Sequence, residues 1–224
     1  MSVRNRYFDL LRGVAILMVI GIHTFLPRDV SWSGFDFGVL ARQSLNAAVP
    51  LFLALSGFFL YRKRLLENKD IIKFWKKQIP KIYIPVLIWS LPLFLHDLIC
   101  GKGVILIMLR LIVCGYSIYY FVALIIQYYL LLPVFQRFKL NGGGLIIVLS
   151  SISIIVVTYF NIVKGMSLPL ILYAGCFALW AVFYYQGCRL SLSDRSYPLW
   201  LPLTISIIGL ILSYLETKYT CWRN

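Results

Sequence analysis

Seven long apolar runs divide this chain of 224 residues. A stretch of about 20 apolar residues is long enough to cross the hydrocarbon core of a bilayer as a helix. Lipid offers no hydrogen bonds to an exposed backbone, so such stretches must be helical or belong to a closed barrel. The pattern predicts an all-α, polytopic transmembrane helix bundle with about seven spans. The runs lie at 8–27, 38–61, 81–99, 117–136, 145–163, 167–187 and 198–215.

A shorter apolar piece at 103–115 differs from these runs because Arg110 interrupts it. It is too short and too charged to cross a bilayer, so it is predicted to be a short interfacial or re-entrant helix.

The composition excludes an ordinary soluble domain, since 61% of the residues are hydrophobic and only 13% are charged. The five cysteines lack the spacing of a metal site or a disulfide framework, and no metal is expected.

The basic residues predict the orientation of the chain. The formal net charge is +14, but Lys and Arg lie in clusters between apolar runs, which is typical of cytoplasmic loops and not of a nucleic-acid-binding surface. With the N-terminus inside, 15 of the 22 Lys and Arg fall on the cytoplasmic side. The first run lacks a signal-peptide cleavage site and should remain as a span. We therefore predict a multi-pass protein of the inner (cytoplasmic) membrane with a cytoplasmic N-terminus.

The first span carries ionisable residues where apolar ones are expected. Arg12 and His23 are eleven residues apart, which at about 100° per residue puts them on nearly the same helical face, with about 16 Å between them along the axis. Ionisable groups inside a bilayer are costly unless they face protein or water, which indicates a functional site. The alternative is that Asp9 pairs with Arg12 one helical turn away while His23 lies at the level of the lipid headgroups.

The second span contains a proline and several small or polar residues. Pro50 removes a backbone hydrogen bond and can kink the helix, shortly after Asn46. Ser56 and Gly57 offer a hydroxyl and a place where a ligand can come close to the backbone. A kink that serves packing, with Ser56 bonded to its own helix, is an equal alternative.

The fourth span has Tyr120 near its start and one amide, Gln127, among several tyrosines. Polar groups on an apolar stripe can line a cavity. Tyrosines also pack helix bundles, with each hydroxyl satisfied by a neighbour, so both interpretations stay open.

The densest basic cluster extends from Arg62 to Lys81 and includes Lys77. Such a cluster can anchor the chain to anionic lipid headgroups. It can equally bind the phosphates of an anionic cytoplasmic donor such as an acyl-coenzyme A (acyl-CoA), because ammonium groups hold phosphates as point charges.

Four ordered motifs resemble the membrane acyltransferase-3 family, and they run across most of the chain. They are Tyr7-Phe8-Asp9-x-x-Arg12-Gly13-x-Ala15-Ile16 with the Arg12 to His23 spacing, Phe52-Leu53-x-x-Ser56-Gly57-Phe58, the basic run into Ile82-Tyr83-Ile84-Pro85, and Tyr120-Phe121 through Pro133. The resemblance implies transfer of an acyl group, usually acetyl, from a cytoplasmic acyl-CoA to a hydroxyl of a cell-surface or lipid-linked carbohydrate. Acyl-CoA would be a cosubstrate, with no bound cofactor. The partners would be the lipid bilayer and the glycan acceptor, without nucleic acid.

The resemblance also suggests roles for individual residues. His23 is implied as the acid/base or acyl-relay residue, and Asp9 of the same motif is the second candidate catalytic residue. Arg12, Lys77 and Lys81 are the candidates for binding the acyl donor. The candidates for lining the site are Ser56, Gly57, Asn46, Tyr120 and Gln127.

Two departures from the family's pattern bear on this assignment. The basic motif before the third helix typically has a pair of arginines, whereas the aligned positions here are Gln78 and Lys81, with Lys77 as a substitute. Family members usually have more helices in a longer domain, so residues 1–224 are expected to be a partial acyltransferase-3 membrane domain, truncated at its C-terminus. The alternative functions are those of a catalytically inactive remnant and of a transporter-like or scaffold membrane protein.

Overall fold

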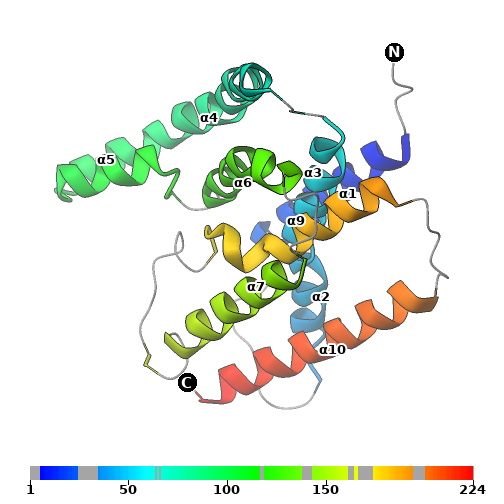
Figure 1. Cartoon of the computed structure of the whole chain (residues 1–224). Helices are drawn as coiled ribbons and strands as arrows, with labels where there is room; N and C mark the ends of the chain where they lie inside the picture. Colours follow the sequence, from blue (N-terminus) through cyan, green and yellow to red (C-terminus); the bar gives the residue numbers. More distant parts are fainter. Residues whose placement is uncertain are drawn as a thin grey trace. The chain divides into compact units, whose positions relative to one another are not determined.

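Helices make up most of the part of the chain that the computed structural model describes, and this part contains no strand. The prediction of an all-α fold is therefore confirmed (Figure 1). The helices are α1 (Arg6–Thr24), α2 (Phe37–Asn46), α3 (Ala48–Tyr61), α4 (Asn68–Ile99), α5 (Val104–Ile112), α6 (Tyr120–Arg137), α7 (Gly143–Thr158), α9 (Phe177–Leu192) and α10 (Trp200–Arg223). The structure describes residues 6–24, 35–63, 65, 67–116, 119–137, 143–160, 164–165, 174–193 and 200–223.

Four helical stretches among these residues are long and apolar enough to cross a membrane. They are α1, the α2–α3 stretch Phe37–Tyr61, α4 and α6. The chain is a multi-pass membrane protein, but the predicted count of seven spans is not confirmed. Helix α7 is apolar but shorter, at 16 residues. The first part of the run predicted at 167–187 lies outside the described residues, and α9 begins only at Phe177.

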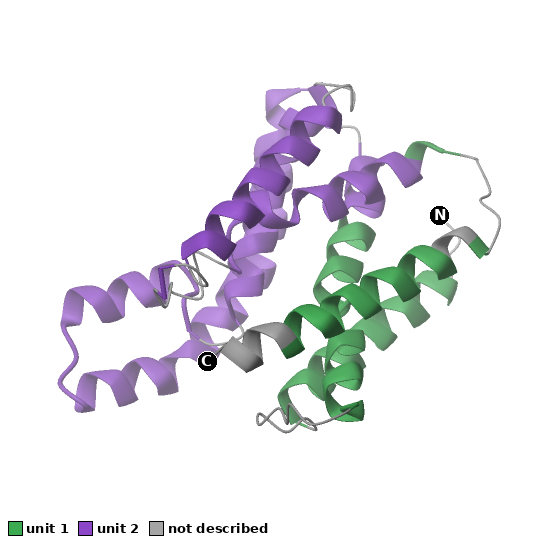
Figure 2. Ribbon diagram, turned by 90° about the horizontal axis from the view of Figure 1, so that it is seen from below, with its two compact units in different colours: residues 1–56, 192–224 green, residues 57–191 purple. Residues whose placement is uncertain are grey.

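The chain divides into two compact units, which are coloured separately in Figure 2. Unit 1 consists of residues 1–56 and 192–224, and unit 2 consists of residues 57–191.

Unit 1 is built on contacts of α2 with α1 and α10. Asp36 caps α2, because its carboxylate accepts a hydrogen bond from the Val39 amide at 3.1 Å. The Asp36 amide also donates to the hydroxyl of Tyr214 in α10 at 2.9 Å. On the other side, Gly21 of α1 lies so close to α2 that an added Cβ would be 2.9 Å from the Leu45 Cδ1 atom. Small residues in α1 thus allow the two helices to approach each other.

The boundary between α2 and α3 follows from Pro50. Helix α2 ends at Asn46 and α3 begins at Ala48, so the apolar stretch is interrupted at Ala47. Pro50 has no N–H to donate to the Asn46 carbonyl four residues earlier, and its ring crowds that carbonyl. The helix is thus interrupted close to Pro50, and the kink predicted there stays a prediction.

Unit 2 is built around α4, which packs against α5 and α6. The side-chain amide of Gln136, at the end of α6, donates to the carbonyls of Tyr61 at 3.2 Å and Lys63 at 2.5 Å, just before α4 begins. Further along, the Trp75 indole N–H of α4 donates to the Tyr129 carbonyl of α6 at 2.9 Å. Contacts in this order show that α4 and α6 run antiparallel.

Helix α5 folds back beside α4 after a turn at Gly101, whose φ of 70° favours glycine (Figure 1). At the far end of α5, the Tyr83 hydroxyl of α4 donates to the Ile112 carbonyl at 2.9 Å. Helix α5 therefore packs along α4 and adds no further membrane-spanning helix among the described residues.

Helix α9 completes the core of unit 2. Its Tyr184 ring stacks on the Tyr128 ring of α6 with 4.3 Å between centroids, and both side chains are buried. The Tyr128 hydroxyl donates to the Phe177 carbonyl at 2.7 Å. Gly57 of α3 also lies directly against the α9 backbone. A Cβ added to Gly57 would be 3.1 Å from the Cys188 amide nitrogen and closer still to the Tyr184 carbonyl oxygen.

Candidate functional site

Helix α1 holds the two predicted catalytic residues and the predicted donor-binding arginine. The helix is uninterrupted from Arg6 to Thr24, so the eleven-residue spacing of Arg12 and His23 corresponds to about 16 Å along one axis. The Arg12 Nη1 atom lies 3.8 Å from the Asp9 Oδ1 atom, with the side chains 47% and 33% exposed. The His23 side chain is also exposed. The ion pair that the sequence suggested as an alternative is therefore formed, and it holds both charges on the first turns of α1.

Asn46 belongs to a polar network that the sequence did not predict. Its side-chain amide donates to the Gln43 Oε1 atom at 3.0 Å, and the Ser213 hydroxyl of α10 donates to the same oxygen at 2.7 Å. The Gln43 amide donates in turn to the Thr217 hydroxyl at 2.5 Å. The spacing of Ser213 and Thr217, one helical turn apart, is the signal in the sequence that could have indicated a polar stripe on α10.

Ser56 and Gly57 lie in α3, where unit 1 ends and unit 2 begins. Ser56 is half-buried. The close approach of Gly57 to Tyr184 and Cys188 gives the glycine a packing role, because only a residue without a Cβ fits there.

Gln127 is bound to the start of α9. Its side-chain amide donates to the Gly175 carbonyl at 2.7 Å, and its carbonyl oxygen accepts from the Phe177 amide at 3.1 Å. The second of these bonds satisfies an amide in the first turn of a helix, which has no partner within the helix. Gln127 thus positions α9 against α6. Tyr120 is the first residue of α6, and its side chain is half-buried.

Lys77 lies in a basic stripe on the first half of α4. A shallow groove of about 470 Å³ there is lined by Lys69, Ile72, Lys73, Lys76 and Lys77. Burial lowers the pKa of Lys63, and the neighbouring charges of Lys77 and Lys81 lower it further. These three ammonium groups therefore act on one another. Lys63, which precedes the helix, lies within the predicted basic cluster but was not among the candidate donor-binding residues.

The pairing of α4 with α6 places these lysines along α6. Lys77 is two residues beyond Trp75, whose indole N–H donates to the Tyr129 carbonyl of α6. Lys81 lies about 6 Å further along α4 in the same direction. Ammonium groups bind lipid headgroups and donor phosphates through the same charge, so both interpretations of the basic cluster stay open.

The structure brings together some of the predicted site residues within each unit. Asp9 and Arg12 pair in unit 1, and Lys77 and Lys81 act together on Lys63 in unit 2. Among the described residues, no group of three or more His, Cys, Asp or Glu is placed to hold a metal ion. The arrangement offers cations for an anionic donor and an exposed imidazole for proton transfer.

Comparison with known proteins identifies one family. The acyltransferase-3 family model, described as an acyltransferase domain, matches residues 5–219. No curated protein and no solved structure matches the chain at a significant level.

Proposed function

Because this chain belongs to the acyltransferase-3 family of membrane acyltransferases, we propose that it transfers an acyl group, acetyl in the first instance, from a cytoplasmic acyl-CoA to a hydroxyl of a cell-surface or lipid-linked carbohydrate. The observation that carries the donor assignment is the cluster of lysines along α4. Coenzyme A is a polyanion through its phosphates, and each ammonium group within reach of a phosphate forms a charge-assisted hydrogen bond.

The donor assignment rests on the basic cluster of unit 2. Lys77 and Lys81 are assigned to the donor's phosphates, and Lys63 is added because burial lowers its pKa and the charges of Lys77 and Lys81 lower it further. A bound polyanion would relieve the repulsion among these three cations, which supplies part of the binding energy. Arg12 is assigned to a further anionic group of the donor, since its guanidinium is partly exposed beside Asp9.

The chemistry is assigned to His23. The sugar hydroxyl attacks the thioester carbonyl, and a carbon–oxygen bond forms as the carbon–sulfur bond breaks. The neutral imidazole accepts the hydroxyl proton during the attack and returns a proton to the leaving thiolate of coenzyme A. The exposed position of His23 near the end of α1 supports this role, because an acceptor hydroxyl can reach it.

The test is transfer of labelled acetyl from acetyl-CoA to polysaccharide by the purified full chain in nanodiscs. His23→Ala should lower the rate by about 10²–10⁴-fold, the usual contribution of general base catalysis, and His23→Gln should not restore it. Thr24→Ala is the matched control, because Thr24 is the neighbouring exposed polar residue and its hydroxyl donates to the Ile20 carbonyl of its own helix at 2.8 Å.

Two outcomes would contradict the proposal. Near-normal transfer by His23→Ala would show that the imidazole is structural. Absence of transfer by the unaltered chain, together with unchanged glycan acylation in cells with and without it, would favour an inactive remnant or a transporter-like or scaffold protein.

A further inference from the structure

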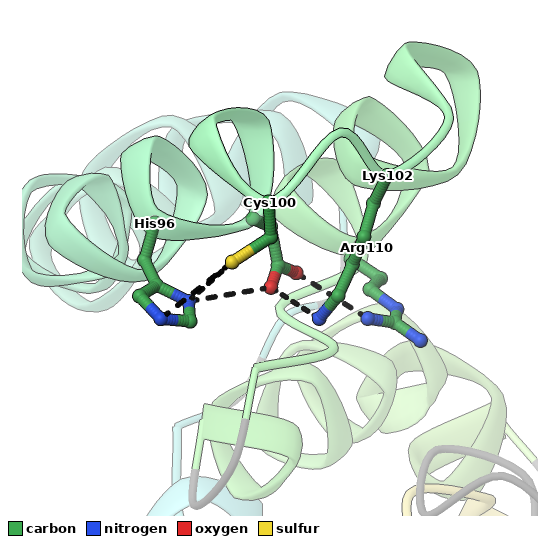
Figure 3. A network of polar contacts seen from close by, with 5 residues as sticks. His96, Cys100, Lys102 and Arg110 are labelled. Atoms are coloured by element: carbon green, nitrogen blue, oxygen red, sulfur yellow. Dashed lines mark hydrogen bonds and ion pairs between the residues drawn. The ribbon is translucent and has the colours of Figure 1, made fainter.

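The end of the α4–α5 hairpin carries a cluster of charges that the proposed transfer reaction does not use (Figure 3). Asp97 of α4 is largely buried and accepts from the Lys102 ammonium group and from the Arg110 Nη1 atom, the latter at 3.4 Å. His96 lies at the edge of the cluster, with its Nδ1 atom 3.8 Å from the Asp97 Oδ1 atom. Two cations thus converge on one carboxylate, which leaves the cluster with a net positive charge when His96 is neutral.

The two cations keep hydrogen-bonding capacity beyond their contacts with Asp97. The Lys102 and Arg110 side chains are 45% and 42% exposed. A guanidinium and an ammonium group each have more N–H donors than one contact to a carboxylate uses. The cluster can therefore accept a second anion from the solvent side without losing its contacts to Asp97.

A buried hydroxyl without a partner among the described residues lies in the turn that follows α5, where the Gly115 amide donates to the Arg110 carbonyl at 2.7 Å. Tyr116 is only 6% exposed, and its hydroxyl has no hydrogen-bond partner in the described part of the chain. Burial raises the pKa of Tyr116, and the charge of Asp97 raises it further, so the hydroxyl stays protonated and available as a donor. The charges of Lys102 and Arg110 also act on it. A buried donor without an acceptor is costly, and an anion held by the two cations would supply the acceptor.

The cluster lies at the opposite end of α4 from the basic stripe. Asp97 is 20 residues beyond Lys77 in the same helix, which corresponds to about 30 Å, the thickness of a hydrocarbon core. If the basic stripe faces the cytoplasm, as the orientation from the basic residues predicts, this cluster faces the outer side, where the acceptor is proposed to bind.

We propose that Lys102, Arg110 and Tyr116 form an anion subsite for the acceptor, which takes a carboxylate or a phosphoryl group of an acidic or phosphate-linked glycan. The inference rests on the proposed function, and it specifies the acceptor as anionic. Arg110 binds the anion through the planar face of N–H donors that suits carboxylates and phosphates, and Tyr116 donates the hydrogen bond that is otherwise unmade.

A purely structural role for the cluster makes a different prediction. If the cations only hold α5 against α4, Tyr116→Phe removes a hydroxyl without a partner and should leave stability unchanged or improved, with no effect on any ligand. If the subsite exists, the same variant is equally stable but binds the anion more weakly. This separation makes Tyr116→Phe the decisive variant.

The experiment measures direct binding of D-glucuronate and of glucose 1-phosphate to the full chain in nanodiscs without acyl donor, with neutral D-glucose as the reference ligand. At least one of the two anions should bind more tightly than glucose, and the one that does so identifies the group as a carboxylate or a phosphate. Tyr116→Phe and Arg110→Gln should each weaken that binding about tenfold or more, the usual effect of losing a hydrogen bond to a charged group. The melting temperature of Tyr116→Phe should not fall.

Ser90→Ala is the matched control. Ser90 is another fully buried α4 residue whose hydroxyl lacks a partner in the described structure, and it lies seven residues before Asp97, or about 10 Å along the helix. Anion binding by Ser90→Ala should equal that of the unaltered chain. Equal binding of glucose and both anions, or unchanged anion binding by Tyr116→Phe, would overturn the subsite. Because no donor is present, these outcomes are independent of whether acyl transfer occurs.

Discussion

Gly57→Ala tests whether the close crossing of α3 and α9 is a packing requirement. The added Cβ would lie 3.1 Å from the Cys188 amide nitrogen and well inside the contact distance of the Tyr184 carbonyl oxygen. Carbon–oxygen contacts between packed helices lie at about 3.3–3.6 Å, so the two backbones must separate by on the order of 1 Å. Overpacking of this kind costs about 1–3 kcal/mol, and a clash against backbone atoms, which cannot rotate away as a side chain can, places Gly57→Ala near the upper end, at about 3 kcal/mol.

The measurement is the free energy of unfolding in detergent, followed by helicity as denaturant is added. Gly209→Ala is the control, since nothing in the described structure lies within 4 Å of a Cβ added to that helical glycine. The control should be neutral or more stable by up to about 1 kcal/mol, because alanine is the better helix former. Equal stability of Gly57→Ala and the unaltered chain would refute the packing argument. Loss of acyl transfer at unchanged stability would instead mark Gly57 as a residue that lines the substrate site.

Two further predictions concern the donor-binding cations. Arg12→Ala should weaken acyl-CoA binding more than acceptor binding, and Arg12→Lys should restore it only in part, because lysine lacks the planar fork of donors; equal acetyl-CoA affinity of Arg12→Ala and the unaltered chain would contradict the assignment. The pKa of Lys63 is lowered by burial and by the charges of Lys77 and Lys81. Between that lowered pKa and the usual lysine value of about 10.4, the unfolded chain binds more protons at this position than the folded chain. The stability of the folded chain therefore rises with pH across this range. Lys63→Gln should flatten this rise in unfolding curves recorded across the alkaline range, and an unchanged slope would show that the lysine is not buried among like charges.

Helix type and several helix boundaries could be predicted from local sequence. Each apolar run predicts a helix because lipid offers the backbone no other partners, and Pro50 predicts the interruption between α2 and α3 because it removes a donor at a known position. The number of spans could not be predicted in the same way. Hydropathy identifies apolar residues, but the length of each helix depends on where it starts and ends, and α7 is only 16 residues long.

In the candidate site, too, features that depend on local sequence could be predicted, and contacts between distant segments could not. The Arg12 to His23 spacing needs only an uninterrupted helix, so it was predictable. The partner of Gln127 was not, because the carbonyl of Gly175 is 48 residues away in the chain and no local pattern encodes that distance. The place of Lys63 among the α4 lysines is equally a property of the folded chain.

The sequence by itself therefore determined that this is an all-α membrane protein of the acyltransferase-3 family with a titratable residue on its first helix. These properties depend on backbone hydrogen bonding, hydropathy and motif spacing, which act over a few turns of chain. Only the tertiary structure decided that Gly57 is a crossing point, that Arg110 returns to Asp97 and that Tyr116 is buried. Those contacts join segments separated in sequence, and their energies depend on distances and burial that exist only once the helices have packed.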